Sequence, residues 1–144
     1  ERASAERVCA LSWSWDGELL AVADRAVKAG GGGTENVVRT FSLTPGGVKN
    51  AAMIRGHSAV VEAVCWGRHH GKFLCSTASD GSVRLWDLRV RRNVGVVGVK
   101  GFPRSVSLSS DGNQGALVTS DGALTLFDLR TRSVQFRSKW GAAV

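Results

Sequence analysis

Apolar and polar residues alternate along most of this chain in short runs, and glycine-containing turns separate the runs. A period of two residues places alternate side chains on opposite faces of a strand, as in a half-buried β-sheet. Tight turns such as Asp80-Gly81 and the segment Thr44-Pro45-Gly46-Gly47 end the runs. The pattern predicts an all-β protein. The expected strands cover residues 8–14, 19–23, 37–43, 51–55, 60–66, 73–79 and 82–86.

One segment of the pattern occurs twice. Residues 79–89 have the sequence SDGSVRLWDLR and residues 120–130 have SDGALTLFDLR, with seven of eleven positions identical at a spacing of 41 residues. Short strands repeated about every 40–45 residues are typical of β-propeller blades. We therefore expect blade one at about residues 7–54, blade two at 55–97, blade three at 98–135 and the start of a further blade at 136–144.

The second repeat carries the most specific motifs: Gly56-His57 near its start, Asp80 in a turn, and Trp86-Asp87 at its end. With these residues the chain resembles the WD-repeat β-propeller family. The resemblance implies about three four-stranded antiparallel blades, a fragment of a seven-bladed ring, because propellers have about 4–8 blades. It also implies a structural hydrogen-bond network of His57, Ser76, Asp80 and Trp86. Blade three has Lys100-Gly101 and Phe127 at two of these places and is expected to lack the network.

Three alternative kinds of chemistry can be weighed against this interpretation. A serine, a histidine and an aspartate also make up a hydrolase triad, but no GxSxG nucleophile turn occurs, so we expect no catalytic residues. His69-His70 lie near Cys65 and Cys75, but adjacent loop residues rarely ligate one ion, and we expect no metal. Gly30 to Gly33 lack a following Gly-Lys-Ser/Thr, which favours a mobile linker over a nucleotide site, with no cofactor and no small-molecule substrate.

Aromatic and sulfur-containing residues fit the same picture. Trp13, Trp15 and Trp66 occupy similar strand positions and are expected to pack between neighbouring sheets. The alternative is that Trp13 or Trp15 lies near a sheet edge and contacts a peptide. The three cysteines show no CxxC spacing, which favours a reduced intracellular compartment over a disulfide framework. No apolar run reaches 18 residues, so we expect no membrane span.

The net charge of +7 arises mainly from arginine. In a propeller, the loops between first and second strands and between third and fourth strands emerge at the same edge. That edge is expected to hold Arg68, Lys72, Arg89, Arg91, Arg92, Arg130 and Arg132. Arginine favours planar contacts with carboxylates and phosphates. The expected partners are therefore acidic protein surfaces or RNA.

Within the WD-repeat family, several segments together are similar to the WD-repeat subunits of THO-type complexes, which couple transcription to messenger-RNA export. They are Ala10-Leu11-Ser12-Trp13, Arg55-Gly56-His57, Val64-Cys65-Trp66, Thr77-Ala78-Ser79 and Val83 to Arg89. The resemblance implies a nuclear, non-enzymatic scaffold subunit of a multiprotein complex for messenger-RNA processing and export. The alternative is a substrate receptor of a cullin-RING ubiquitin ligase, because Trp86-Asp87-Leu88-Arg89 also resembles the WDxR motif of such receptors.

Overall fold

The computed structural model describes residues 7–28, 30–68 and 73–139, and within these residues the chain forms twelve strands in three antiparallel sheets. The first sheet contains β1 (Arg7–Trp13), β2 (Leu19–Val27), β3 (Thr34–Thr44) and β4 (Gly47–Arg55). The second contains β5 (Val61–Trp66), β6 (Phe73–Ala78), β7 (Ser82–Asp87) and β8 (Arg92–Gly98). The third contains β9 (Pro103–Leu108), β10 (Gln114–Thr119), β11 (Ala123–Asp128) and β12 (Ser133–Lys139). The described part of the chain contains no helix that could cross a membrane.

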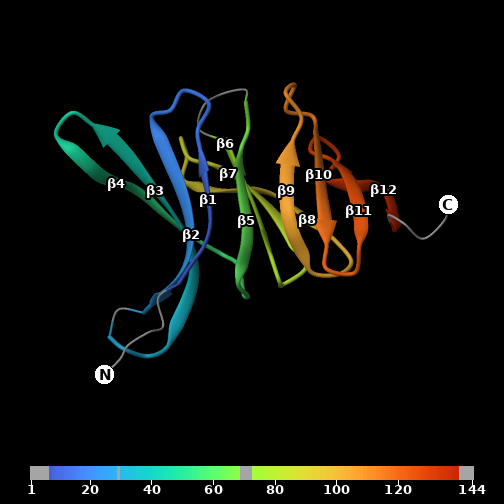
Figure 1. The fold of residues 1–144 in the computed structure, drawn as a ribbon, viewed down its shortest axis with the longest axis horizontal. Coiled ribbons are helices and arrows are strands. Elements are labelled where there is room, and N and C mark those ends of the chain that lie inside the picture. Colours follow the sequence, from blue (N-terminus) through green and yellow to red (C-terminus); the bar gives the residue numbers. More distant parts are fainter. Residues whose placement is uncertain (1–6, 29, 69–72, 140–144) are drawn as a thin grey trace.

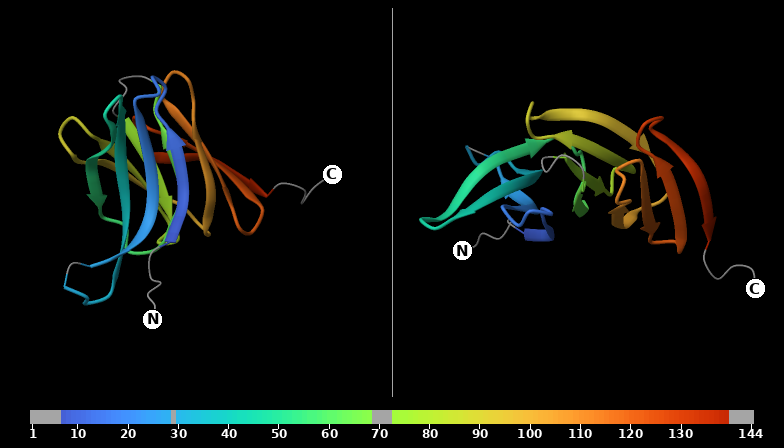
Figure 2. Two further views of the ribbon diagram at one scale, coloured as in Figure 1. Left: turned by 60° about the vertical axis from the view of Figure 1, so that its left-hand side comes forward. Right: turned by 90° about the horizontal axis from the view of Figure 1, so that it is seen from above.

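The three sheets stand side by side along the chain (Figure 1). Seen from above, they fan out around a common side, with β1, β5 and β9 innermost and β4, β8 and β12 on the outside (Figure 2). Each sheet follows the simple order of its strands in sequence, joined by hairpins. This arrangement confirms the expected all-β fold of three four-stranded antiparallel propeller blades.

Two apolar layers hold the stack together, because the buried residues of each strand face a neighbouring sheet. Between the first and second sheets, Ala21, Ala23 and Val38 pack with Trp66 and Leu74. The Trp66 indole Nε1 also donates a hydrogen bond across this boundary to the carbonyl oxygen of Ser12, at 2.9 Å. The second layer joins the second and third sheets through residues Ala63, Cys75, Val83, Leu85, Val97, Val106, Leu117, Phe127 and Leu129.

The tryptophans differ in their surroundings. Trp66 is buried as expected, but Trp13 and Trp15 are 50% and 62% exposed, so within the described sheets these two do not pack as expected. The reason is that Trp66 faces back toward the first sheet, whereas Trp13 faces away from the second sheet, where no described residue covers it. Trp15 instead lies under the Arg68 guanidinium, whose carbon is 4.6 Å from the ring centroid.

The glycine-rich insertion forms part of a β-hairpin. Strands β2 and β3 stay paired from Leu19↔Ser42 to Val27↔Thr34, which makes this hairpin longer than its counterparts in the other two sheets. The backbone N–H of Lys28 donates to Gly33 O at 2.9 Å, and that of Gly31 donates to Lys28 O at 3.0 Å. Gly30, Gly31 and Gly33 have positive φ angles, which glycine adopts without strain. The expectation of a loose linker therefore gives way to a closed turn.

The end of the third sheet also differs from the expected boundary. Residues 136–139, expected to begin a further blade, belong to β12, which pairs with β11 as the outer strand of the third sheet. In the same way, β4 precedes the Gly56-His57 motif of the second repeat but closes the first sheet. The sequence repeat and the sheet are thus offset by one strand. Residues 140–144 lie outside the described residues.

Candidate interaction surface and the network beneath it

Four side chains of the second sheet form one hydrogen-bonded chain. The indole N–H of Trp86, on β7, donates to Ser76 Oγ, on β6, at 2.7 Å. Ser76 Oγ lies 2.8 Å from His57 Nε2, and His57 Nδ1 lies 2.9 Å from Asp80 Oδ2 in the β6–β7 turn. The structure thus brings together all four residues of the network that the resemblance implies.

The donors and acceptors of this chain assign the protonation of His57. If Nδ1 carries the proton, it donates to Asp80, and Nε2 accepts from the Ser76 hydroxyl. Burial lowers the pKa of His57 below its ordinary value and outweighs the opposing effect of the Asp80 carboxylate. The imidazole is therefore neutral at pH 7. Although the two groups are at ion-pair distance, their contact is a hydrogen bond from a neutral ring to a carboxylate.

Asp80 anchors the other end of the chain. Its carboxylate accepts the backbone N–H of Ser58 at 3.1 Å and both the hydroxyl and the backbone N–H of Ser82. Burial acts to raise the pKa of Asp80, but the hydrogen bonds from Ser82 and His57 outweigh it, and the pKa of Asp80 is lowered. Hydrogen bonds to the charged form of a carboxyl have this effect.

Access to the network is closed. The Ser76 residue is fully buried and the His57 side chain is 1% exposed, so both groups are shielded from solvent. The glycine of the Gly-His pair also has a packing role, because a Cβ atom at Gly56 would lie 2.8 Å from the Trp86 ring. The arrangement has the chemistry of a buried structural network, in which every polar group has a partner.

The third sheet replaces this network with apolar packing. Leu117 stands where the second repeat has Ser76, and Phe127 stands where it has Trp86, at the same spacing of 41 residues. Both are buried, and the Phe127 ring lies directly over Gly115, whose hydrogen leaves room for it. A hydroxyl is not needed at this position, since phenylalanine has no N–H to satisfy.

The expected basic residues lie at one edge of the stack, the edge of the β1–β2, β5–β6 and β9–β10 connections that is uppermost in Figure 1. Arg68 follows β5. Arg89, Arg91 and Arg92 lie at the β7–β8 turn, and Arg130 and Arg132 lie at the β11–β12 turn. We call these six residues the arginine edge. Lys72, also expected there, lies outside the described residues, as do His69 and His70.

The six arginines have different surroundings. Arg89 forms a two-pronged contact with its neighbour Asp87, at 2.9 and 2.6 Å, which raises the pKa of Arg89 through hydrogen bonding and charge. The carboxylate of Asp128 accepts the backbone N–H groups of Arg130 and Thr131, not the Arg130 guanidinium. Among the described residues, no carboxylate lies within ion-pair distance of Arg68, Arg91, Arg92, Arg130 or Arg132.

Two of these arginines also contact the preceding sheet. Arg91 and Arg132 have left-handed backbone conformations, with φ angles of 54° and 56°, at equivalent places in their turns. Arg132 lies over Gly95 of β8, with its Nε 3.1 Å from where a Cβ would stand. Arg91 lines a hollow with Ala51 and Ala52 of β4. Small residues on the outer strand of one sheet thus leave room for an arginine side chain of the next sheet.

Sequence analysis did not identify a polar hollow at the opposite edge, of about 310 Å³. Its lining residues come from the long β2–β3 hairpin and from the segment before β5: Lys28, Thr34, Glu35, Asn36, Arg55, Gly56, His57 and Ser58. Arg55 and Glu35 are paired at 2.9 Å, which lowers the pKa of Glu35. The buried Oδ1 of Asn36 has no hydrogen-bond partner within the described residues. The length of the insertion after Asp24 was the signal that could have pointed to it.

No group of three or more histidine, cysteine, aspartate or glutamate side chains within residues 7–28, 30–68 and 73–139 could hold a metal ion.

Comparison with known proteins fits the geometry. Residues 49–87, from β4 through β7, match the model of the family described as "WD domain, G-beta repeat". The chain is 26% identical over 141 residues to THO complex subunit 3 of Arabidopsis thaliana, covering 96% of this chain and 42% of that protein.

Two further relatives match shorter parts. The WD repeat-containing protein AAC3 of Dictyostelium discoideum is 24% identical over 123 residues, covering 72% of this chain and 26% of that protein. The SIR4-interacting protein SIF2 of Saccharomyces cerevisiae is 32% identical over 87 residues, covering 60% of this chain and 16% of that protein. The chain therefore spans less than half the length of each of these relatives.

The three fanned sheets and the buried histidine–serine–tryptophan network are the features expected of WD-repeat propeller blades. Residues 49–87 match the WD-repeat family, and the distant similarity of the chain to THO complex subunit 3 extends over nearly all of its residues.

Proposed function

We propose that this chain is part of a non-enzymatic scaffold that binds an acidic surface of a partner protein through the arginine edge. The observation that carries the proposal is the placement of six arginines from two neighbouring sheets at one edge, where only Arg89 has a carboxylate partner among the described residues. A rigid sheet that presents charged loops is a common way to build a binding surface. Unpaired arginines also attract acidic partners over a distance.

We further propose that this scaffold belongs to a nuclear assembly for messenger-RNA processing and export. The support is the similarity to THO complex subunit 3, which covers 96% of the chain. Other subunits of such an assembly would be the direct partners. RNA contacts at the same edge are the competing possibility, and they would rest on the same arginines.

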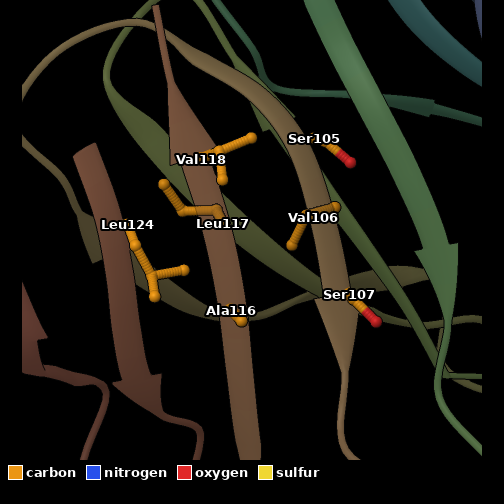
Figure 3. Close-up of a pocket in the computed structure, with 7 residues that line it drawn as sticks. All are labelled: Ser105, Val106, Ser107, Ala116, Leu117, Val118 and Leu124. Atoms are coloured by element: carbon orange, nitrogen blue, oxygen red, sulfur yellow. The ribbon is translucent and has the colours of Figure 1, made fainter. Parts of the chain in front are cut away.

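We infer that further blades cover the two outer faces of the stack in the whole protein, as in a seven-bladed ring. On the third sheet, the face turned away from the second carries Val118, Leu126 and Phe136, which are 44%, 39% and 50% exposed. Figure 3 shows Val118 of β10 and Leu124 of β11 close together, with Ser105 and Ser107 on the adjacent strand. Leu11 and Trp13 expose a similar apolar face on the first sheet.

The test is affinity capture of the full-length protein from a nuclear extract, with and without ribonuclease. The proposal expects messenger-RNA processing and export subunits to be captured in both cases. Capture lost on ribonuclease treatment would mean that RNA, not a protein surface, is the partner. Recovery of a cullin and its adaptor would favour the WDxR alternative, in which Arg89 is the motif arginine.

Charge-reversal variants connect the capture to the arginine edge. Arg92→Glu with Arg130→Glu should reduce recovery of the partners, because both guanidinium groups are free of described carboxylates. Arg137→Glu is the matched control, since Arg137 pairs with Asp121 at 2.9 Å on the opposite edge of the third sheet. Equal loss in both variants would show a general charge effect and contradict the proposed surface.

A further inference from the structure

Two cysteines lie opposite each other on adjacent strands of the second sheet. Cys65 on β5 and Cys75 on β6 are direct partners in the antiparallel register, with Val64↔Ser76 and Trp66↔Leu74 on either side. Residues opposite each other in such a pair have Cα atoms about 4.5–5.5 Å apart. A disulfide bridges Cα atoms about 4.4–6.8 Å apart, so this pair is within bridging range without movement of the strands.

The pair lies at the boundary between the second and third sheets. Cys75 is fully buried in the apolar layer with Val83 and Val106, and Cys65 is partly exposed at the border of that layer. Cys65 is therefore the residue of the pair that a small reagent would reach first.

Packing does not require sulfur at this place. The equivalent cross-strand pair is Ser12↔Ala21 in the first sheet and Ser107↔Ala116 in the third. The fold therefore accepts a hydroxyl and a methyl group at these two positions. Two thiols in the second sheet alone are a chemical difference between blades that are otherwise built alike.

The two sulfurs are chemically unequal. The neighbouring Cys75 thiol and the backbone of Leu108 lower the pKa of Cys65 although burial opposes them. The same contact and complete burial raise the pKa of Cys75. Since the thiolate is the reactive form, Cys65 is the nucleophile and Cys75 remains a thiol.

We propose that Cys65 and Cys75 form an oxidation site for hydroperoxides. The Cys65 thiolate attacks the peroxide oxygen, the O–O bond breaks, and Cys65 becomes a sulfenic acid while hydroxide or an alkoxide leaves. The Cys75 sulfur then attacks the Cys65 sulfur, its proton goes to the departing hydroxyl group, and a disulfide and water form. The peroxide is reduced by two electrons and the thiol pair is oxidised by two.

The Cys65–Cys75 disulfide would link β5 covalently to β6 in the sheet that carries the His57 network. It would also convert the Cys65 sulfur, whose thiolate form the backbone of Leu108 at the end of β9 stabilises, into a neutral disulfide sulfur. Oxidation therefore changes a contact between the second and third sheets, next to Arg68 at the arginine edge.

The experiment treats the folded full-length protein with hydrogen peroxide, followed by alkylation and non-reducing peptide mapping by mass spectrometry. The expected result is one cross-linked peptide pair containing Cys65 and Cys75, lighter by two hydrogen atoms, with Cys9 still alkylated. Dithiothreitol should restore both thiols.

Variants copied from the neighbouring sheets keep the test independent of folding. The Cys75→Ala variant carries the residue that the first and third sheets have at the equivalent positions, Ala21 and Ala116. In this variant the Cys65 sulfenic acid should accumulate and be trapped by dimedone. The Cys65→Ser variant likewise carries the residue found at the equivalent positions Ser12 and Ser107. In this variant peroxide should leave Cys75 unmodified. Absence of both the disulfide and the dimedone adduct at Cys65, or a disulfide that includes Cys9, would overturn the proposal.

Discussion

Ser76 shows how one residue connects two strands and a loop. Its hydroxyl accepts from Trp86 and lies within hydrogen-bond distance of His57, and all three side chains are buried. A buried N–H or ring nitrogen without a partner costs more free energy than an ordinary hydrogen bond contributes. The hydroxyl therefore matters through the two groups that it satisfies.

We expect Ser76→Ala to lower the free energy of unfolding by about 1–3 kcal/mol, because both Trp86 Nε1 and His57 Nε2 lose their partner. Urea denaturation of the purified protein measures the difference. Ser107→Ala is the control, since its exposed hydroxyl should contribute less than about 0.5 kcal/mol. Equal stability of Ser76→Ala and the unchanged protein would contradict a supporting role for the network.

We expect the free energy of unfolding to fall as the pH drops below about 6.5, the pKa of an unperturbed histidine. The unfolded chain binds a proton at His57 more readily than the folded protein, because burial lowers the folded pKa. The contribution of the neutral His57 to the free energy of unfolding is complete above the pKa of this histidine in the unfolded chain. It is lost as the pH falls toward the pKa of His57 in the folded protein. Asp80, with its own lowered pKa, adds a further loss only at more acidic pH.

Urea denaturation between pH 7.5 and pH 5 measures this effect. In His57→Ala the pH dependence across that range should be weaker, while His69 and His70 remain as internal controls. The same slope in both proteins would assign the effect to other groups.

At the scale of the element, the third sheet shows what replaces the network. Gly115 on β10 has no side chain, and the Phe127 ring of β11 occupies the space where a Cβ atom would stand. Leu117 fills the place of the buried serine. Two sheets with the same strand order thus fill equivalent buried positions in different ways, the second with hydrogen-bonded polar groups and the third with apolar side chains.

We expect Gly115→Ala to destabilise the protein by about 1–3 kcal/mol, the range for overpacking a tight core, because the added methyl group overlaps Phe127. Thermal or urea denaturation measures the change. Gly98→Ala on β8 is the matched control, since no heavy atom lies within 4 Å of its added methyl group. Adding Phe127→Leu should recover part of the loss; no recovery would mean that the strain lies elsewhere.

The sequence predicted the strands and the network well, because both depend on local patterns. The period of two fixes which residues share a face, and the spacing of His57, Ser76, Asp80 and Trp86 follows from the resemblance to WD repeats. The exposure of Trp13 and the contact of Arg132 with Gly95 could not be predicted in this way. They depend on which sheet lies beside a residue, which is a property of the stack. The pairing of β2 with β3 up to Val27↔Thr34 likewise could not be predicted from the four glycines.

At the scale of the whole molecule, most described carboxylates are already engaged. Glu35, Glu62 and Asp121 pair with arginines at the edge opposite the arginine edge, and Asp87 pairs with Arg89. At the arginine edge, Arg68, Arg92 and Arg130 lack described carboxylate partners, so their charges remain available to a partner. Charge at the rim of an interface acts mainly on the rate of association.

We expect Arg92→Glu with Arg130→Glu to slow association with an acidic protein partner much more than it accelerates dissociation. The unchanged protein should associate more slowly as salt is raised, because a Debye length of about 8 Å at physiological ionic strength screens exposed charges. The double variant should lose most of this salt dependence. Surface plasmon resonance at several salt concentrations measures both rates.

The control for this measurement is Arg137→Glu, which makes a charge reversal at the opposite edge and should leave the salt dependence of association nearly unchanged. If the partner is RNA, the affinity itself should fall steeply with salt, by a slope that decreases as arginines are removed, because each phosphate contact releases counterions. Association that is indifferent to both salt and the double variant would mean that the arginine edge is ordinary solvated surface. The scaffold would then bind through another face, and the polar hollow between the long β2–β3 hairpin and His57 would be the next surface to test.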